Sequence, residues 1–279
     1  MSDPKVQPAV ASTDGTSASA SEQSIFAVFD AREDALQRPV KVFDADPDLV
    51  SDLDPASARV LRHRTVADSL VLEEGPWTPP AEQELGPGSI GLLVLDGLLS
   101  RTVRFDGLES PELVGAGDLL RPWEDGAFAA SLEFETEWRV LDRATVALLD
   151  ERFARQTCRV PAVTARLLAR AVERCRWLSF QLAIAHVRRA EARIVMLFWH
   201  LADRWGRVTP AGVVVPLRLT HVTIARLICM RRPTVSATLR RLARTGELAR
   251  NEDGTWILTG APPDLSSITS RRAAGREAA

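Results

Sequence analysis

The 279-residue chain is close to neutral as a whole, but its charge is unevenly distributed. Residues 1–150 hold 12 basic and 28 acidic side chains, whereas residues 187–260 hold 13 and 5. A basic C-terminal part of this kind is typical of proteins that bind nucleic acid. The apolar runs are far shorter than the roughly 20 residues that span a bilayer, and the first residues lack the apolar stretch of a secretory signal. We therefore expect a cytoplasmic protein.

The cysteines exclude several classes of protein. Cys158, Cys175 and Cys229 are widely separated, with no CxxC pair and no histidine at ligand spacing. A disulfide framework, a zinc site and an iron–sulfur cluster are therefore not expected. We predict that the chain needs no metal and no cofactor.

The N-terminal half is predicted to hold a tail and a β domain. Residues 1–24 are rich in Ser, Thr, Ala and Gly without periodicity, which predicts disorder. Within residues 25–150, short apolar runs alternate with turn residues, which is typical of an antiparallel β-roll or jelly roll. The predicted strands are Ser69–Leu72, Ile90–Leu95, Leu98–Phe105, Glu112–Val114, Ser131–Phe134 and Trp138–Leu141. Asp96-Gly97 lies directly between two of these runs and predicts a hairpin turn.

Beyond Ala144 the turn signals become rare and a helical period begins. Residues 151–187 are predicted to form a long helix and a hinge, with apolar side chains at three- and four-residue steps from Val160 to Ala185. Such a stripe pairs helices in coiled coils and predicts a dimer seam. Packing of the helix on its own domain is the alternative. The stripe consists of Val163, Leu167, Ala171, Cys175, Leu178 and Leu182.

Residues 188–260 show the pattern of a winged helix-turn-helix domain. After a helix over Arg188–Ala202, Thr220 is a suitable N-cap for a short helix that ends near Cys229. Pro233 fits the first turn of a second helix, about residues 232–245, that stops at Gly246. The runs that flank residues 251–254 predict a hairpin that serves as the wing. The remaining residues, 261–279, are predicted to be a flexible tail.

The second helix of this pair carries a basic and polar face opposite its apolar stripe. A recognition helix contacts bases with its N-terminal residues, where the Arg fork matches guanine. The predicted base-reading residues are Arg232, Thr234 and Ser236. The predicted phosphate contacts are Thr220, Arg231, Arg240, Arg241 and Arg244. The alternative for any one of these arginines is that it lies on a solvent-exposed basic surface and does not contact DNA.

This segment resembles the winged helix-turn-helix of the Crp–Fnr family of bacterial transcription regulators. In that family an Arg and then Thr-Val-Ser or Thr-Val-Gly open the recognition helix, and here the residues are Arg232-Pro233-Thr234-Val235-Ser236. The order of the predicted parts is also similar, over about residues 46–260: an α+β chain with an N-terminal β-roll, a long dimerisation helix and a C-terminal winged helix. The resemblance implies a homodimer that binds near-palindromic double-stranded DNA, with RNA polymerase as a further partner.

The chain departs from the family pattern at two places. Pro233 stands where members that read the common half-site carry a Glu, and proline cannot accept a hydrogen bond from cytosine, so we expect a different half-site. After Gly117-Asp118 the chain lacks the Gly-Glu and Arg-Ser pairs of members that bind cyclic nucleotides. Glu124 and Asp125 would also repel a cyclic phosphate. Cyclic AMP is therefore not expected to bind.

Two kinds of regulator remain open at this point. An effector-gated regulator would bind an unidentified small molecule in the β-roll, and Trp77, Trp123 and Trp138 are candidates to line its pocket, with packing as the alternative. A ligand-independent regulator would use the roll as a scaffold and as a surface that contacts RNA polymerase. The sequence shows no nucleophile with a base, no phosphate loop and no metal-ligand spacing, so the chain is not expected to be an enzyme.

Overall fold

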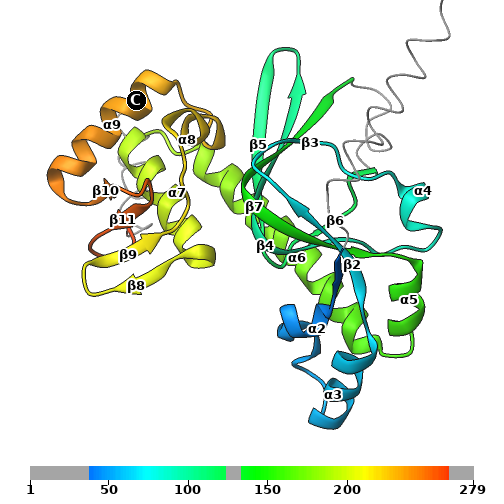
Figure 1. Cartoon of the computed structure of the whole chain (residues 1–279). Coiled ribbons are helices and arrows are strands. Elements are labelled where there is room, and N and C mark those ends of the chain that lie inside the picture. The colour runs from blue at the N-terminus through cyan, green and yellow to red at the C-terminus, as the bar shows by residue number, and fades with distance from the viewer. Residues whose placement is uncertain (1–37, 124–132, 264–279) are drawn as a thin grey trace, which may run out of the picture.

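The computed structural model describes residues 38–123 and 133–263. The tail predicted for residues 1–24, most of the tail predicted for residues 261–279, and Glu124 and Asp125 lie outside these ranges. The described residues form an N-terminal β-sheet with flanking helices, one long helix, and a second lobe of helices and short strands beside the sheet (Figure 1). The predicted α+β fold is confirmed.

Short elements precede the sheet and cover its lower end. They are β1 (Arg38–Val40), α2 (Val42–Ala45), the 3-10 helix η1 (Pro47–Val50) and α3 (Pro55–Arg64). The side chain of Asp54 accepts hydrogen bonds from the backbone N–H groups of Ala56 and Ser57 and so caps α3. Phe43 of α2 is fully buried against Phe153, with ring centroids 5.9 Å apart. The segment therefore adds a small core to the end of the roll.

The sheet is antiparallel and built on two long strands. Besides β1, its strands are β2 (Ala67–Leu72), β3 (Gly75–Trp77), β4 (Gly91–Phe105), β5 (Leu108–Gly115), β6 (Leu119–Leu120) and β7 (Glu135–Leu149), with α4 (Glu82–Leu85) after β3. The order is β1-β2-β7-β4-β5, while β3 pairs with β7 and β6 with β4. Leu92, Val94 and Val146 are fully buried on the inner face. This topology agrees with the predicted β-roll.

The hairpin predicted at Asp96-Gly97 is wrong. Both residues lie inside β4, where the register with β7 shifts at β-bulges. Gly97 has φ +88°, and a Cβ there would overlap the carbonyl oxygen of Arg143 and the Cα of Ala144. Glycine is needed for the close approach of the two strands. The hairpin that joins β4 to β5 instead turns at Asp106-Gly107, where both residues have positive φ, as a two-residue type I′ turn requires.

The helical period begins later than predicted. Strand β7 continues through Ala144 to Leu149, because its residues from Ala144 to Leu148 pair with β2. The short helix α5 (Glu151–Thr157) follows, with Asp150 as its N-cap, accepting a hydrogen bond from the backbone N–H of Phe153. Of the predicted strand Ser131–Phe134, residues 131–132 lie outside the described ranges, and the other two precede β7.

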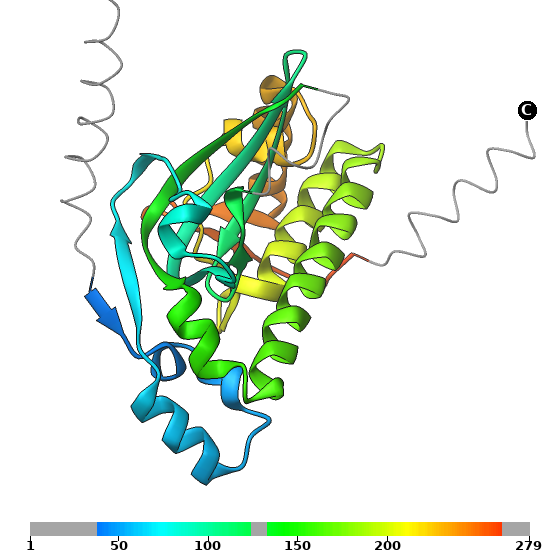
Figure 2. The same ribbon diagram turned by 90° about the vertical axis from the view of Figure 1, so that its right-hand side faces the viewer.

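The long helix α6 (Pro161–Ala185) is confirmed, but its predicted stripe does not lie on one surface. Val163 and Leu167 are buried in the core shared with α2 and α5, so they are not available to a second subunit. Ala171 and Leu178 are half-buried, whereas Cys175 and Leu182 are exposed. Figure 2 shows α6 running along the side of the sheet. The predicted stripe therefore combines residues of an inward apolar face with residues of an outward one.

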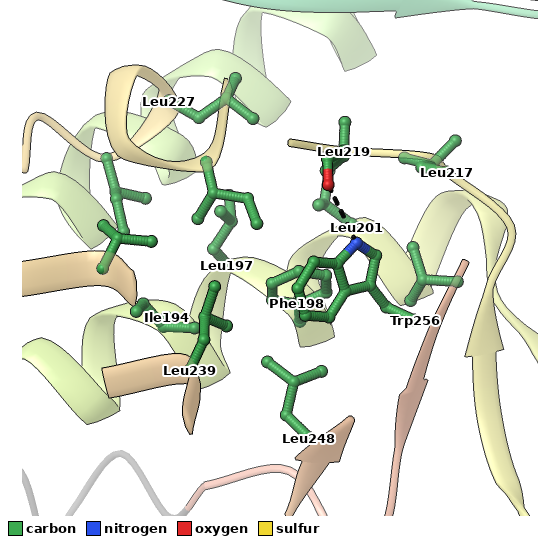
Figure 3. Packing of buried hydrophobic residues seen from close by; sticks show 14 of the residues in the cluster. Ile194, Leu197, Phe198, Leu201, Leu217, Leu219, Leu227, Leu239, Leu248 and Trp256 are labelled. Atoms are coloured by element: carbon green, nitrogen blue, oxygen red, sulfur yellow. Dashed lines mark hydrogen bonds between the residues drawn. The ribbon is translucent and has the colours of Figure 1, made fainter. Parts of the chain in front are cut away.

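The C-terminal lobe is a helix-turn-helix with a small sheet. It consists of α7 (Ala190–Trp205), β8 (Arg207–Thr209), β9 (Gly212–Val215), α8 (His221–Leu227), α9 (Arg232–Thr245), β10 (Leu248–Arg250) and β11 (Trp256–Leu258). The sheet order is β10-β11-β9-β8, so the predicted wing hairpin pairs with the strand before the helix pair. Leu197 and Phe198 of α7 pack with Leu239 and Trp256 (Figure 3). The Trp256 indole donates to the carbonyl oxygen of Leu219 at 3.3 Å.

An aromatic cluster joins α6 to α7. His200 of α7 stacks on Trp177 of α6, with ring centroids 3.4 Å apart, and Phe180 lies 5.1 Å away. His200 is buried, and its Nε2 has no hydrogen-bond partner. Burial lowers the pKa of His200 to about 4, a backbone hydrogen bond with Trp177 opposes this change, and the charge of Arg204 adds to it. The imidazole is therefore neutral at neutral pH.

His200 is expected to make the protein sensitive to acid. In the unfolded chain it titrates near pH 6.5, so unfolding takes up a proton as the pH falls from 6.5 to 4. Stability is fully present above that window and decreases within it, by about 3 kcal/mol at most. Urea unfolding at fixed protein concentration across pH 4–7 measures how steeply the free energy of unfolding depends on pH. His200→Phe keeps an aromatic ring on Trp177 but cannot titrate, so its slope should be shallower, and an unchanged slope would contradict this assignment.

In the described part of the chain, no helix is both long enough and apolar enough to cross a membrane.

Candidate nucleic-acid interface

The first helix of the pair, α8, is fixed by a side-chain cap and a buried face. The hydroxyl of Thr220 accepts a hydrogen bond from the backbone N–H of Thr223 at 3.1 Å, as the sequence predicts for an N-cap. Ile224 and Leu227 are buried, whereas Thr220 itself is exposed. The N-terminus of α8, which carries a partial positive charge, is thus open to an anion from outside.

A tight turn separates α8 from α9. Cys229 adopts a positive φ of 50°, and the N–H of Met230 bonds to the carbonyl oxygen of Ala225 at 2.8 Å. Helix α9 then begins at Arg232 with Pro233 in its first turn and ends at Gly246, which has φ +77°. The predicted bounds of α9, residues 232–245, are confirmed, whereas α8 ends at Leu227, slightly before the predicted Cys229.

Helix α9 buries one face and exposes the other. Val235, Leu239 and Leu242 are buried in the core of the lobe, as predicted. The opposite face carries the exposed residues Arg231, Arg232, Thr234, Ala237, Arg240, Arg241 and Arg244. Helix α9 lies on the side of the lobe away from the β-roll sheet (Figure 1). A large ligand could reach this face without displacing any other described part of the chain.

Two of the predicted contact residues pair with side chains of other helices. The hydroxyl of Ser236 is half-buried and shares a hydrogen bond of 2.9 Å with Nδ1 of His221. The guanidinium of Arg241 pairs with Glu191 of α7 at 2.5 Å. Arg232 and Thr234, which lie in the first turn of α9, are more open to a base edge than Ser236.

The electrostatics of His221 show how arginines gather at this face. Burial lowers the pKa of His221, and the positive charges of Arg250, Arg232 and Arg240 lower it further. These arginines come from the wing strand β10 and from α9, and each is near enough to His221, the first residue of α8, to affect its pKa. The arrangement suits a polyanion, since a phosphate could approach several guanidinium groups at once.

Two further arginines lie at the wing and are not among the predicted contacts. Arg250 lies over the Trp256 ring at 5.8 Å and donates from Nε to the carbonyl oxygen of Gly254. Arg218 lies beside the wing tip and is exposed; its charge contributes to the lowered pKa of Asp253, after that carboxylate's stronger hydrogen bonds with Thr255. Arg250 borders the predicted hairpin, and this position in the sequence is enough to indicate a contact from the wing. Arg218 is brought there by tertiary packing alone.

The candidate effector residues of the β-roll pack instead with one another. Trp138 is buried, and Trp77 meets it edge-on with ring centroids 5.8 Å apart. Trp123 is partly buried against the same cluster. Arg121, which follows the Gly-Asp turn, donates to the carbonyl oxygens of Ser89 and Ile90. These contacts favour the packing alternative. No group of metal-ligating side chains occurs among the described residues.

The Crp-like helix-turn-helix domain family matches residues 192–260. This range begins in α7 and ends just after β11, so it covers the whole candidate interface. No curated protein sequence matches the chain.

Three of the solved structures that match this chain share between 13% and 18% sequence identity with it. A double mutant of CooA from Carboxydothermus hydrogenoformans is 18% identical over 73% of this chain and 86% of its own, with a TM-score of 0.52. FixK2 from Bradyrhizobium japonicum is 13% identical over 73% and 96%, with a TM-score of 0.51. A cyclic nucleotide-binding domain containing protein from Listeria monocytogenes is 15% identical over 68% and 87%, with a TM-score of 0.53. At these identities the likeness establishes the fold alone.

Proposed function

Residues 192–260 form a Crp-like helix-turn-helix domain in a chain with the Crp–Fnr regulator fold, and on this premise we propose that the protein is a homodimeric, sequence-specific transcription regulator. The exposed basic face of α9, next to Arg250 of the wing, carries the proposal. Arg232 and Thr234 would read bases, whereas Arg231, Arg240, Arg244 and Thr220 would contact phosphates. Ser236 would act through His221, and Arg241 would need to leave Glu191 to reach DNA.

An exposed apolar stripe on α6 supports dimerisation. Leu168, Val172 and Leu182 are 64%, 42% and 63% exposed, which is unusual for large apolar side chains on one helix. The exposed positions repeat at alternating steps of three and four residues, which is the spacing of a coiled-coil seam. The stripe consists of Ala165, Leu168, Val172, Cys175, Ser179 and Leu182. In a coiled coil, a β-branched residue at one of the two core positions and leucine at the other favour a parallel pair of helices.

Cys175 allows this seam to be tested directly. In a parallel pair of helices, Cys175 would face its counterpart across the two-fold axis, where a mild oxidant can join the two thiols. Cys158 and Cys229 are also exposed but lie off the stripe, so they serve as matched controls. Three variants that each keep a single cysteine are oxidised and run on a non-reducing gel. Only the Cys175 variant should form a covalent dimer; cross-linking confined to Cys158 or Cys229 would place the interface elsewhere.

Selection from random duplex DNA tests the function itself. We expect the purified protein, without ligand and at a stated salt concentration, to enrich a near-palindrome with half-sites about 34 Å apart, one helical turn. A parallel selection with cyclic AMP should yield the same sequence at the same affinity. Enrichment only after adding a cell metabolite extract would support an effector-gated regulator instead. Salt-sensitive binding without enrichment in every arm would contradict sequence-specific recognition.

A further inference from the structure

Arginines from both long helices converge on one turn of the β-roll. This turn, residues 115–119, joins β5 to β6 and will be called the β5–β6 turn. Arg170 of α6 pairs with Asp46 and donates to the carbonyl oxygen of Gly117 at 3.3 Å. Arg174 of α6 pairs with Glu112 and donates to the carbonyl oxygen of Leu119 at 3.4 Å. The turn is therefore held firmly against the long helix.

Arg204 extends this network into the DNA-binding lobe. From the C-terminal end of α7, its Nη2 pairs with Oδ2 of Asp118 at 2.8 Å and lies 3.2 Å from the carbonyl oxygen of Ala116. The side chains of Asp118 and Arg204 are only 5% and 20% exposed. Asp118 also accepts a hydrogen bond from the N–H of Gly115 at 2.8 Å, so the same carboxylate shapes the turn and binds the lobe.

The neighbours of Arg204 leave it little freedom. Its guanidinium lies 4.7 Å from the ring centroid of Trp205 and 5.8 Å from that of Trp177. The indole of Trp205 lies so close to Gly115 that a Cβ there would be 2.9 Å from Nε1. The two rings and the β5–β6 turn therefore restrict the positions that the Arg204 guanidinium can adopt.

This contact orients the lobe without covering its DNA face. Leu98 and Leu113 of the sheet belong to the same buried cluster as Leu197 of α7 and Leu239 of α9. A fixed α7 therefore fixes α9. The recognition residues remain exposed, and α9 lies on the far side of the lobe from the sheet (Figure 1). The roll thus sets a direction for α9 and does not block it.

We propose that Arg204 is a positioning residue that locks the DNA-binding lobe onto the β5–β6 turn, so that the recognition helices of the dimer are correctly spaced without a bound effector. The inference rests on the proposed function and extends it to regulation. The two DNA-binding lobes of a dimer can bind both half-sites at once only if the distance and angle between the lobes match those of the half-sites. Loss of Arg204 should therefore affect binding to the palindrome and not to a single half-site.

The test compares affinities for the selected palindrome and for a duplex with one half-site. For Arg204→Ala, we expect the ratio of the two affinities to fall about tenfold or more, while half-site affinity stays within about twofold of the wild type. Asp118→Asn should have the same effect, and the double variant should be no worse than either single one, since both changes break one pair. Arg204→Lys keeps the charge without the planar fork and should restore part of the ratio.

Arg155→Ala is the matched control, because Arg155 is 72% exposed and pairs with Glu151 within α5. It should leave the ratio unchanged. An unchanged ratio in both Arg204→Ala and Asp118→Asn, with folding verified by circular dichroism, would overturn the proposal. Tighter binding of Arg204→Ala to the palindrome would also overturn it, since the contact would then be inhibitory.

A readout without DNA separates this inference from the proposed function. Fluorescent probes on α9 and on the β4–β5 hairpin report the distance between lobe and roll. We expect a narrow distribution in the wild type and a broad one in Arg204→Ala. If the wild type shows no preference for any palindrome, the proposed function is wrong. If the distributions of probe distances are equal in the wild type and in Arg204→Ala, the positioning role of Arg204 is wrong as well.

Discussion

Arg232→Ala is expected to lower affinity for the selected DNA site by about 1–3 kcal/mol, roughly five- to 150-fold, with a much smaller effect on unrelated DNA. Arg232 is exposed at the first residue of α9, the part of a recognition helix that lies deepest in the major groove. A bidentate contact with a base is lost when the fork is removed. Fluorescence anisotropy at one salt concentration, on the site and on single-base variants, measures both affinity and preference.

Arg244→Ala is the matched control for this prediction. Arg244 is also an exposed arginine of α9, but it lies in the last turn, where a docked helix passes the phosphate backbone. Its loss should weaken binding to all sequences alike and reduce the slope of log K against log salt by about one. Arg241 is less suitable, because its pair with Glu191 would also be broken. Equal loss of base preference in both variants would mean that the N-terminal turn of α9 does not read the site.

The helix-turn-helix could be predicted closely because its signals are local. The cap at Thr220, proline in the first turn of α9 and the left-handed Gly246 each act within a few residues. The cluster of Arg250, Arg232 and Arg240 around His221 could not be predicted in the same way. It arises only when β11 pairs with β9 on one side and with β10 on the other, which brings distant residues together.

The errors in the β-roll and the long helix also have nonlocal causes. An Asp-Gly pair between apolar runs fits a hairpin and a bulge equally well, and pairing of β4 with β7 decides between them at Gly97. Helix α6 has apolar residues on two faces, one against the roll core and one exposed. The spacing of apolar residues shows that they recur along the helix, but not which surface each of them contacts. The predicted stripe therefore includes the buried Val163 and Leu167 together with the exposed Cys175 and Leu182.

Leu167→Ala and Leu168→Ala should therefore affect different properties, although the residues are neighbours. Leu167 is 2% exposed, so its truncation should lower the free energy of unfolding by about 2–5 kcal/mol through a cavity in the roll core. Leu168 is 64% exposed in the subunit, and its truncation should leave that core intact but raise the dimer dissociation constant. Urea unfolding and sedimentation equilibrium measure the two quantities separately.

Leu168→Lys should have the largest effect on DNA binding. Two lysines facing each other in an apolar seam lose their hydration and repel each other, so the dimer should dissociate. Affinity for the palindrome should then fall by about 100-fold or more, towards that of a single half-site, because the linkage between two recognition helices is lost. Val208→Lys is the control, since Val208 is 87% exposed on β8 and away from α6. A Leu168→Lys protein that remains a dimer would exclude the α6 seam, since two lysines would then face each other inside it.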